Sequence, residues 1–261
     1  YLEKRLNPCL LVPGVRSIIS LALNYAPAQQ IPKGEYQIAA YALGQDYHDL
    51  MKLKMRELAT KIAEQYQIPQ NKEDEEPTIR CFCDTAPVLE RYWAQKAGLG
   101  WVGRNHQLII PHAGSMFFLG EIFLPFDTDN YDEPIPNRCG RCHRCIDACP
   151  TRAIIPDEDF HAERCLSYQL IENREELSDE AKAAMGDTIY GCDRCQTACP
   201  WNRYATPNTE PTLQPKPELL SMSKEKWHNL TVEEYQRLFK GSAVKRVKFE
   251  GLKRNITVKK F

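Results

Sequence analysis

Two cysteine-rich runs in the second half of the chain contain the residues best suited to chemistry. The first, C-G-R-C-H-R-C-I-D-A-C-P, covers residues 139–150, and the second, C-D-R-C-Q-T-A-C-P, covers residues 192–200. The first run has the spacing C-x2-C-x2-C-x3-C-P, in which three thiolates hold one 4Fe-4S cluster and the fourth binds a neighbouring cluster. This spacing predicts two 4Fe-4S clusters, which transfer electrons one at a time.

The second run has one cysteine fewer than the first, and the isolated Cys165 between the runs is the candidate that completes it. The two-cluster pattern exchanges the fourth cysteine of each run, so each cluster receives four thiolates. Cluster one then consists of Cys139, Cys142, Cys145 and Cys199, and cluster two consists of Cys149, Cys165, Cys192 and Cys195.

Zinc sites and disulfides are the alternatives for these cysteines. Zinc sites use C-x2-C pairs separated by a spacer and need neither a third cysteine after two more residues nor a terminal C-P. Disulfide scaffolds belong to small secreted domains, whereas this chain has 261 residues and eleven cysteines, most of them within one third of its length. Iron and sulfur are therefore favoured, with zinc as the alternative.

Composition indicates a soluble globular protein of one large or two unequal domains. The chain is 43% hydrophobic and 26% charged, with a formal net charge of -1. It contains neither an apolar run as long as a membrane span nor an export signal, and we expect a reducing compartment, the cytoplasm, and no membrane association. Because the chain opens on Tyr1 rather than Met, we also expect residues to be missing before it.

Apolar patterns in the first half of the chain alternate between strand and helix, which predicts an α/β (α+β) layer. The glycine-rich stretch 98–103 is expected to be a loop, and the acidic stretch Glu73–Glu76 a solvated connection. The expected strands cover residues 17–25, 79–83, 107–110 and 116–124, and the expected helices cover residues 46–67 and 84–97.

Prolines and aspartates make residues 125–138 a predicted linker into the cysteine-rich part. The sequence then predicts a short strand at 151–155, a helix at 162–176 with Cys165 near its start, and a helix at 232–239. These patterns divide the chain into residues 1–126, a two-cluster ferredoxin-like domain at 127–210, and an extension at 211–261. The extension ends in a basic tail, which suits either a phosphate backbone or a solvated helix face; its cations are Lys245, Arg246, Lys248, Lys253, Arg254, Lys259 and Lys260.

Asp84 follows a predicted strand and precedes a predicted helix, where α/β proteins commonly bind ligands. The sequence Asp84-Thr85-Ala86-Pro87 is also a typical helix start, and a helix cap is the favoured interpretation of Asp84. The stretch Asp46-Tyr47-His48 is likewise expected to be a cap with a packed aromatic. Gly98, Gly100 and Gly103 follow a predicted helix and not a strand, and the sequence has no Walker-type phosphate loop, so nucleotide binding is not favoured. The histidines show no metal-ligand spacing.

Several longer motifs together resemble the epoxyqueuosine reductase family. They are D-Y-H at 46–48, C-D-T-A-P-V-L-E-R at 83–91, A-G-L-G-W-V-G-R-N at 97–105 and the two cysteine runs. The resemblance implies a cytoplasmic, cobalamin-dependent enzyme that reduces the epoxide of epoxyqueuosine at the wobble position of tRNA. It also implies a nitroreductase-like cobalamin-binding domain, residues 1–126 here, followed by the bacterial-ferredoxin-like module.

The resemblance assigns roles to individual residues. Asp84 is the implied general acid, and its pKa should be raised if a corrin covers it in an apolar site. For Leu108 and Leu119, ordinary strand core is the alternative. The implied cobalamin contacts are Arg5, Ala39, Asp84, Leu108, Leu119, Ser167 and Asp193.

The implied reaction sends electrons from an external donor of the flavodoxin or ferredoxin type through the clusters to cobalamin. Two electrons and two protons then convert the epoxide into an alkene and water, in a protein expected to be a monomer. Many family members carry C-terminal helical repeats that help to hold tRNA, and the basic tail is the expected substitute here. The alternatives are a reductive dehalogenase-like enzyme and a ferredoxin-type electron carrier or nucleic-acid-binding module without an active site.

Overall fold

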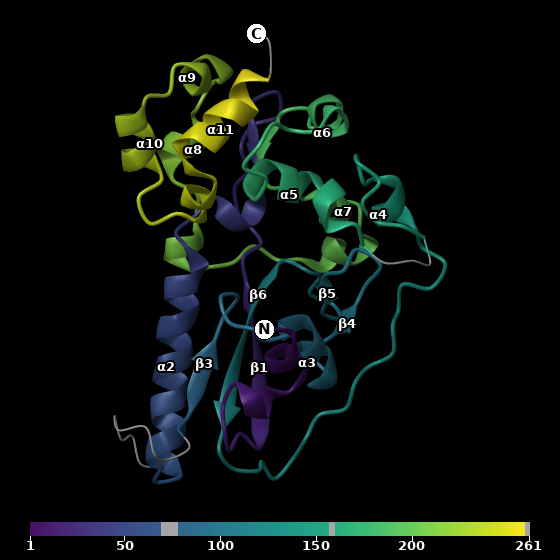
Figure 1. Cartoon of the computed structure of the whole chain (residues 1–261), viewed down its shortest axis with the longest axis vertical. Helices are drawn as coiled ribbons and strands as arrows, with labels where there is room; N and C mark the ends of the chain where they lie inside the picture. Colours follow the sequence, from purple (N-terminus) through teal and green to yellow (C-terminus); the bar gives the residue numbers. More distant parts are fainter. Residues whose placement is uncertain (69–77, 157–159, 259–261) are drawn as a thin grey trace.

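Three antiparallel strands form the central sheet of the lower body in Figure 1. The computed structural model describes residues 1–68, 78–156 and 160–258. The strand order is β1 (Ser17–Asn24), β6 (Phe117–Leu124), β3 (Arg80–Phe82). β1 pairs with β6 over its full length, from Ser17 opposite Leu124 to Asn24 opposite Phe117. The mixed α/β class is as expected, but the alternation of strands and helices does not produce a parallel central sheet.

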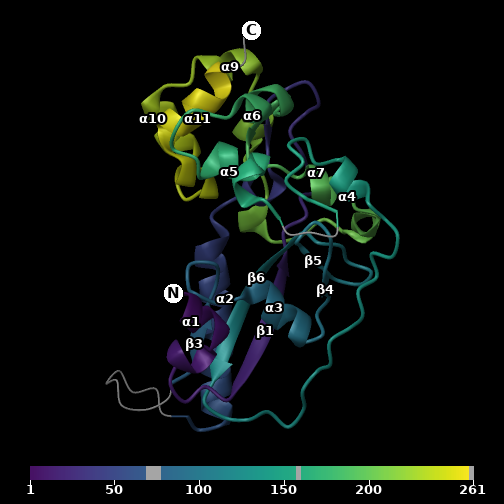
Figure 2. The same cartoon turned by 45° about the vertical axis from the view of Figure 1, so that its right-hand side comes forward.

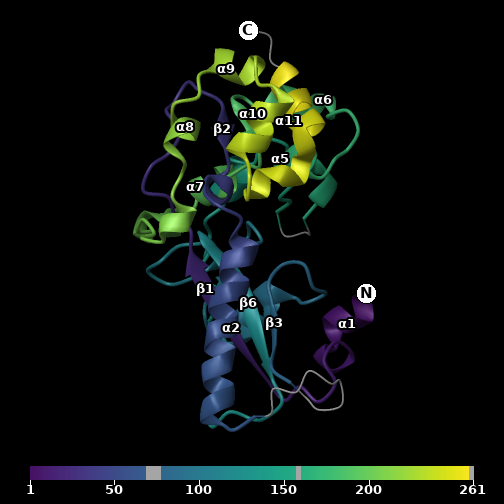
Figure 3. The same cartoon turned by 90° about the vertical axis from the view of Figure 1, so that its left-hand side faces the viewer.

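The long helix α2 (Tyr47–Gln65) covers one face of this sheet, as Figure 3 shows. Its buried residues Met51 and Met55 pack against Phe118 and Ile122 of β6. Burying a methionine side chain contributes about 1.5–3 kcal/mol. A Cβ on Gly120 would lie only 2.7 Å from the Met55 sulfur, so glycine allows the helix to lie this close to the strand.

The short helix α3 (Glu90–Lys96) lies against the opposite face of the sheet, where Ala94 packs on Leu108 and Leu119. It ends before Gly98, which has a φ of +67°. Next come β4 (Trp101–Val102) and β5 (Leu108–Ile109), which pair as a hairpin, so the stretch expected to be a loop at 98–103 contains a strand. The short helix α1 (Leu2–Leu6) lies near the N-terminus.

The upper body contains both cysteine runs. α4 (Arg144–Asp147) lies in the first run and α7 (Arg194–Thr197) in the second, and the two helices contact each other. Between the runs, α5 (Leu166–Ile171) and α6 (Asp179–Ala184) pack through Leu166, Leu170, Ala181 and Met185. Cys165 is the N-cap of α5, so its position near a helix start is confirmed.

Helices from the C-terminal part complete the upper body: α8 (Pro217–Leu220), α9 (Lys224–His228), α10 (Val232–Leu238) and α11 (Lys248–Thr257). Their core includes Trp227 and Phe239, and it also takes in β2 (Gln37–Ile38) and β7 (Thr188–Tyr190), which form a small parallel sheet. The segment around β2 therefore leaves the lower body and packs with the C-terminal helices, as Figure 2 shows from another side.

Most sequence predictions of helices and strands are confirmed, including β1, β3, β5, β6, α2 and α10. The predicted linker is confirmed as well, because residues 125–138 contain no helix or strand. None of the helices in the described parts of the chain is long and apolar enough to span a membrane.

Four local predictions are wrong. The helix expected from residue 84 begins only at Glu90. The helix expected at 162–176 is a 3-10 turn followed by α5, with a break at Cys165, whose ψ of 127° is extended. The strand expected at 151–155 is reduced to one bridge between Ile154 and Phe160, and the loop at 98–103 contains β4. The acidic stretch 73–76 and Lys259 and Lys260 lie outside the described residues.

The basic tail forms part of the upper body instead of a free arm. Leu252 and Ile256 of α11 are fully buried. Arg254 donates hydrogen bonds to the carbonyl oxygens of Gln169, Asn173 and Glu175. Part of the positive charge that could have bound a phosphate backbone, that of Arg254, therefore stabilises the fold instead.

Candidate active site and cluster sites

The four cysteines assigned to cluster one line a small cavity of their own. Cys139 and Cys142 precede α4, Cys145 lies within it, and Cys199 follows α7. Arg104, Asn105, Ile109, Pro200 and Trp201 complete the lining. Cys149 belongs to the first run but is not among the lining residues, so the structure separates it from its sequence neighbours as the exchanged assignment requires.

The spacing of the thiols also bears on the zinc alternative. Within the described residues, no three His, Cys, Asp or Glu side chains converge closely enough to hold a single metal ion. A cubane cluster holds its thiolates at separate irons around a larger core. The four cysteines that line this cavity are the number that one 4Fe-4S cluster needs.

The cysteines assigned to cluster two line a second, larger cavity. They come from the end of the first run, the N-cap of α5 and the start of the second run: Cys149, Cys165, Cys192 and Cys195. Burial raises the pKa of Cys192 to about 11 and that of Cys195 to about 12, and neighbouring thiolates of the same set add to both shifts. Such a set is held as thiolates only when a positive metal centre binds it.

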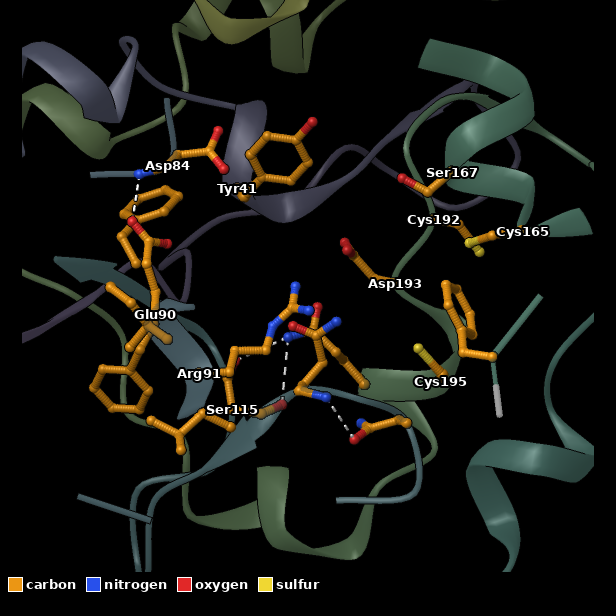
Figure 4. A pocket seen from close by; sticks show the side chains of 18 of the residues that line it. Tyr41, Asp84, Glu90, Arg91, Ser115, Cys165, Ser167, Cys192, Asp193 and Cys195 are labelled. Carbon is orange, nitrogen blue, oxygen red and sulfur yellow. Dashed lines mark hydrogen bonds between the residues drawn. The ribbon is translucent and has the colours of Figure 1, made fainter. Parts of the chain in front are cut away.

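This larger cavity, of about 540 Å³, lies at the junction of the two bodies. Its size is typical of cofactor and small-molecule sites. Figure 4 shows Asp84 and Glu90 on one side of it and Cys165, Cys192 and Cys195 on the other, with Asp193 between them. Six of the residues implied by the resemblance line it: Arg5, Asp84, Leu108, Leu119, Ser167 and Asp193.

Ala39 is the exception, because it is not among the residues that line the cavity. It is buried, and its N–H donates to the carbonyl oxygen of Tyr190. The next residue, Ala40, donates its N–H to Asp193 Oδ2 at 2.6 Å. Ala39 therefore lies behind Asp193, and the expected direct contact with a ligand is not supported.

Asp84 does not cap a helix. It has a φ of +56°, in the left-handed region, and lies in an irregular stretch between β3 and α3. The N-cap of α3 is Leu89, which makes no side-chain capping bond. The Asp84 carboxylate instead accepts hydrogen bonds from the Tyr47 hydroxyl at 3.0 Å and from His48 Nε2 at 3.1 Å. A non-glycine residue held in this backbone region is a recognised sign of a functional site.

Asp46, His48 and Asp84 form a carboxylate–imidazole–carboxylate row. His48 Nδ1 lies 2.6 Å from Asp46 Oδ1, and Asp46 also caps α2 by accepting the His48 N–H. The hydrogen bonds to Asp46 and then to Asp84 raise the pKa of His48 to about 9. The bonds from His48, and then from Tyr47, lower the pKa of Asp84 in the protein without a cofactor, and the rise expected beneath a bound corrin stays a prediction. Near pH 7 the proton of this row therefore resides on His48.

The expectation of a cap with a packed aromatic at 46–48 is confirmed, since Tyr47 stacks on Phe118 with ring centroids 4.0 Å apart. The sequence pattern did not reveal that the same residues reach Asp84. Tyr47 and His48 lie 37 and 36 residues before Asp84, so no local sequence pattern predicts these contacts. They form because α2 lies beside β3.

Glu90 is a further cavity residue that the sequence did not single out. It is the first residue of α3, and its Oε1 accepts the backbone N–H of Asp84. Burial raises its pKa to about 7, from an ordinary value of 4.5. Glu90 therefore exchanges its proton near neutral pH while directly holding the Asp84 loop.

Glu121 of β6 is fully buried beneath α3, and no hydrogen-bond partner for its carboxyl oxygens lies among the described residues. Ser20, which is opposite Glu121 in the sheet, has a buried hydroxyl that is equally unpartnered there. Burial, and then the charge of Glu90, raise the pKa of Glu121 to about 9. The protein must therefore hold Glu121 protonated at neutral pH.

Glu121→Gln is expected to remove a pH dependence of stability. The unfolded side chain loses its proton near 4.5 and the folded one near 9, so stability is highest below the first value and falls as pH rises between them. The loss is about 1.4 kcal/mol per pH unit, or about 3 kcal/mol at pH 7. Melting temperatures from pH 6 to 8 should fall for the wild type and much less for the variant. Glu64→Gln on the exposed side of α2 is the control, and parallel curves for all three proteins would contradict the buried-acid interpretation.

Two family models match the chain. The first, described as "Epoxyqueuosine reductase QueG, DUF1730", matches residues 5–85. The second, described as a 4Fe-4S double cluster binding domain, matches residues 138–202 and so contains every cysteine of both predicted clusters.

Curated and solved proteins give the same result over nearly the whole chain. The epoxyqueuosine reductase of Cellulophaga algicola is 43% identical over 256 residues, covering 98% of this chain and 81% of the relative. A crystal structure of epoxyqueuosine reductase with a tRNA-Tyr epoxyqueuosine-modified stem loop has a TM-score of 0.81 at 29% identity, covering 98% of this chain and 67% of the other. The Bacillus subtilis epoxyqueuosine reductase, solved with its catalytic aspartate loop swung out of the active site, has a TM-score of 0.82 at 28% identity. The match covers 99% of this chain and 68% of the other.

Proposed function

Because this chain belongs to the epoxyqueuosine reductase family, we propose that it reduces epoxyqueuosine to queuosine at the wobble position of tRNA, using cobalamin and two 4Fe-4S clusters. One observation carries the proposal. A single cavity is lined by Asp84 on one side and by all four cysteines of cluster two on the other. A substrate held in it lies between a proton source and an electron source.

The chemistry of the residues that line the cavity suits part of a cobalamin. Leu108, Leu119 and Phe118 give it an apolar wall, while Arg5, Ser167 and Asp193 supply polar groups for the corrin side chains. No histidine is among the residues that line it within the described chain, so the protein offers no imidazole ligand for the cobalt from this wall. When bound, cobalamin supplies a strongly reducing metal centre that accepts single electrons and acts on the epoxide carbon.

The chain's own residues supply the protons. Reducing the epoxide to an alkene and water consumes two electrons and two protons, and C–O cleavage places negative charge on oxygen. His48 holds a proton at pH 7 and donates a hydrogen bond to Asp84, which faces the cavity. Asp84 passes this proton to the substrate oxygen as the bond breaks. Glu90, with a pKa of about 7, is the nearest further acid for the second proton.

The order of the clusters follows from which cavity they line. Cluster two lies at the larger cavity and is the immediate donor to it. Cluster one has a separate cavity, and Asn105 lines both cavities. Electrons therefore enter the protein at cluster one, pass to cluster two and then reach the cofactor.

The tRNA must present its anticodon base at the Asp84 side of the cavity. Arg246 lies there, because its charge acts on Asp84, and it is exposed while it forms an ion pair with Glu172. Lys245 and Lys248 are exposed beside it in sequence. These residues, and not the packed helix α11 as a whole, are the part of the basic tail that we propose to meet the tRNA.

The test combines binding with turnover. Reconstituted protein should retain cobalamin through gel filtration, and with a strong reductant it should convert epoxyqueuosine into queuosine in tRNA, followed by nucleoside mass spectrometry. A ferredoxin-type carrier would show cluster absorption and retain no corrin. A reductive dehalogenase-like enzyme would retain corrin and leave epoxyqueuosine intact, so either result would overturn the proposal.

A further inference from the structure

Three arginines alternate in sequence with the cysteines that the first run gives to cluster one. In the sequence R-C-G-R-C-H-R-C, residues 138–145, an arginine directly precedes each cysteine that the first run gives to this cluster. Arg138, Arg141 and Arg144 are all exposed. We call these three residues the arginine face.

The arginine face carries positive charge that the protein does not neutralise. No ion pair of Arg138, Arg141 or Arg144 occurs among the described residues. Asp147, three residues after Arg144, is engaged by His143 at 2.6 Å. Arg104, by contrast, donates hydrogen bonds to the carbonyl oxygens of Gly140 and Cys142, so it supports the loop from below.

The position of this face matters for electron entry. None of the cluster-one cysteines is among the residues that line the larger cavity, and α4, which carries Cys145, lies at the outer edge of the upper body in Figures 1 and 2. A donor protein docked at α4 reaches cluster one first. A donor at the opposite side of the upper body meets the C-terminal helices instead.

We propose that the arginine face is the docking surface for a small acidic electron-transfer protein of the flavodoxin or ferredoxin kind. The inference rests on the proposed electron path through cluster one. Complementary charge speeds diffusional encounter by about 10–10³-fold at low salt without requiring a tight complex. Electron-transfer complexes have small, transient interfaces, which a patch of a few residues can serve. Arginine suits such a surface because its guanidinium pairs with carboxylates in a fork.

The tRNA is the competing partner for a basic surface. Its modified base must enter the cavity that holds Asp84, whereas the arginine face belongs to the residues around the separate cluster-one cavity. Exposed Arg246, Lys245 and Lys248 lie in the segment whose charge reaches Asp84 and are better placed for the anticodon. The observations therefore favour the protein donor.

The experiment measures how fast a reduced flavodoxin reduces the clusters of the holoenzyme by stopped-flow absorbance. The double variant Arg141→Glu/Arg144→Glu should slow this step at least tenfold at low salt, and the difference from wild type should shrink at high salt. Arg141→Gln/Arg144→Gln, which removes charge without reversing it, should give a smaller loss in the same direction. Arg56→Glu/Lys61→Glu on the exposed side of α2 makes the same charge change and should leave the rate unaltered.

Three further readouts separate the possible outcomes. Reduction by dithionite and iron content should match wild type in both arginine variants, and so should their affinity for tRNA. A flavodoxin rate that is unchanged at low salt overturns the proposal, as does a loss of tRNA affinity that accompanies the slower rate. Failure of the wild type to reduce epoxyqueuosine with dithionite would count against the proposed function alone, because the docking step is measured at the clusters.

Discussion

Asp84→Asn is expected to retain iron and cobalamin and to lose epoxide turnover by about 10²–10⁴-fold, the usual contribution of a positioned acid. The asparagine oxygen can still accept the bonds that Tyr47 and His48 donate, so the loop between β3 and α3 keeps its conformation. It cannot carry a proton from His48 to the substrate. Queuosine formed per enzyme, iron content and corrin absorbance are the three measurements.

A matched substitution controls for the loss of one negative charge. Asp49→Asn changes an exposed aspartate in the first turn of α2, close in sequence to His48, and should leave turnover near wild type. Wild-type turnover in Asp84→Asn would disprove the acid role. Loss of corrin in Asp84→Asn would instead assign Asp84 to binding.

The pH profile tests where the proton is held. The hydrogen bonds to Asp46 and Asp84 raise the pKa of His48 to about 9, and burial raises that of Glu90 to about 7, so wild-type turnover should fall in two steps, first as Glu90 loses its proton near pH 7 and then as His48 loses its proton near pH 9. If Asp84 held the proton alone, its lowered pKa would make turnover fall already in the acid range. The position of the alkaline fall therefore decides between His48 and Asp84 as the resting site of the proton.

The grouping of the cysteines could be predicted from sequence because ligand spacing is a local property. In the two-cluster ferredoxin spacing, the first three cysteines of a run hold one cluster and the fourth binds the other. The structure brings Cys199 to the first run and Cys149 to the second set, as expected from this rule. The 4Fe-4S double cluster match covers the same stretch.

The backbone conformation and the hydrogen-bond partners of Asp84 could not be predicted from sequence. The stretch Asp84-Thr85-Ala86-Pro87 has the local signals of a helix start, yet the helix begins at Glu90. Bonds to Tyr47 and His48 hold Asp84 at positive φ, and those partners come from another element. Tertiary hydrogen bonds thus outweigh a capping preference of about 1 kcal/mol, and they lower the pKa of Asp84 in the protein without a cofactor.

The burial of Glu121 could not be predicted from sequence either. Glu121 sits in an apolar strand, F-F-L-G-E-I-F-L, where alternation alone cannot say whether a charged residue faces solvent. Only the position of α3 over this face makes it fully buried. For Leu108 and Leu119 the family resemblance implied a cofactor contact and the strand pattern favoured the core; both leucines line the cavity and also belong to the core.

Single cysteine variants are expected to show which thiolates share a cluster. With the exchanged assignment, Cys199→Ala and Cys142→Ala should lose the same cluster, although their residues come from different runs. Cys149→Ala and Cys195→Ala should both lose the other one. Each variant should keep about half of the iron, because each cluster has its own four ligands. Electron paramagnetic resonance of the reduced proteins identifies the surviving cluster by its spectrum.

The physical basis is the separation of the two cavities. Cys142 and Cys199 line the small cavity together, while Cys149 and Cys195 line the large one. If each run instead kept its own fourth cysteine, Cys142→Ala would match Cys149→Ala and Cys199→Ala would match Cys195→Ala. Turnover gives a second distinction. Loss of cluster one should abolish epoxyqueuosine reduction that is driven by a donor protein. Part of the reduction that is driven by dithionite should remain, because dithionite can reach cluster two through the open cavity. Loss of cluster two, the immediate donor to the cofactor, should abolish both.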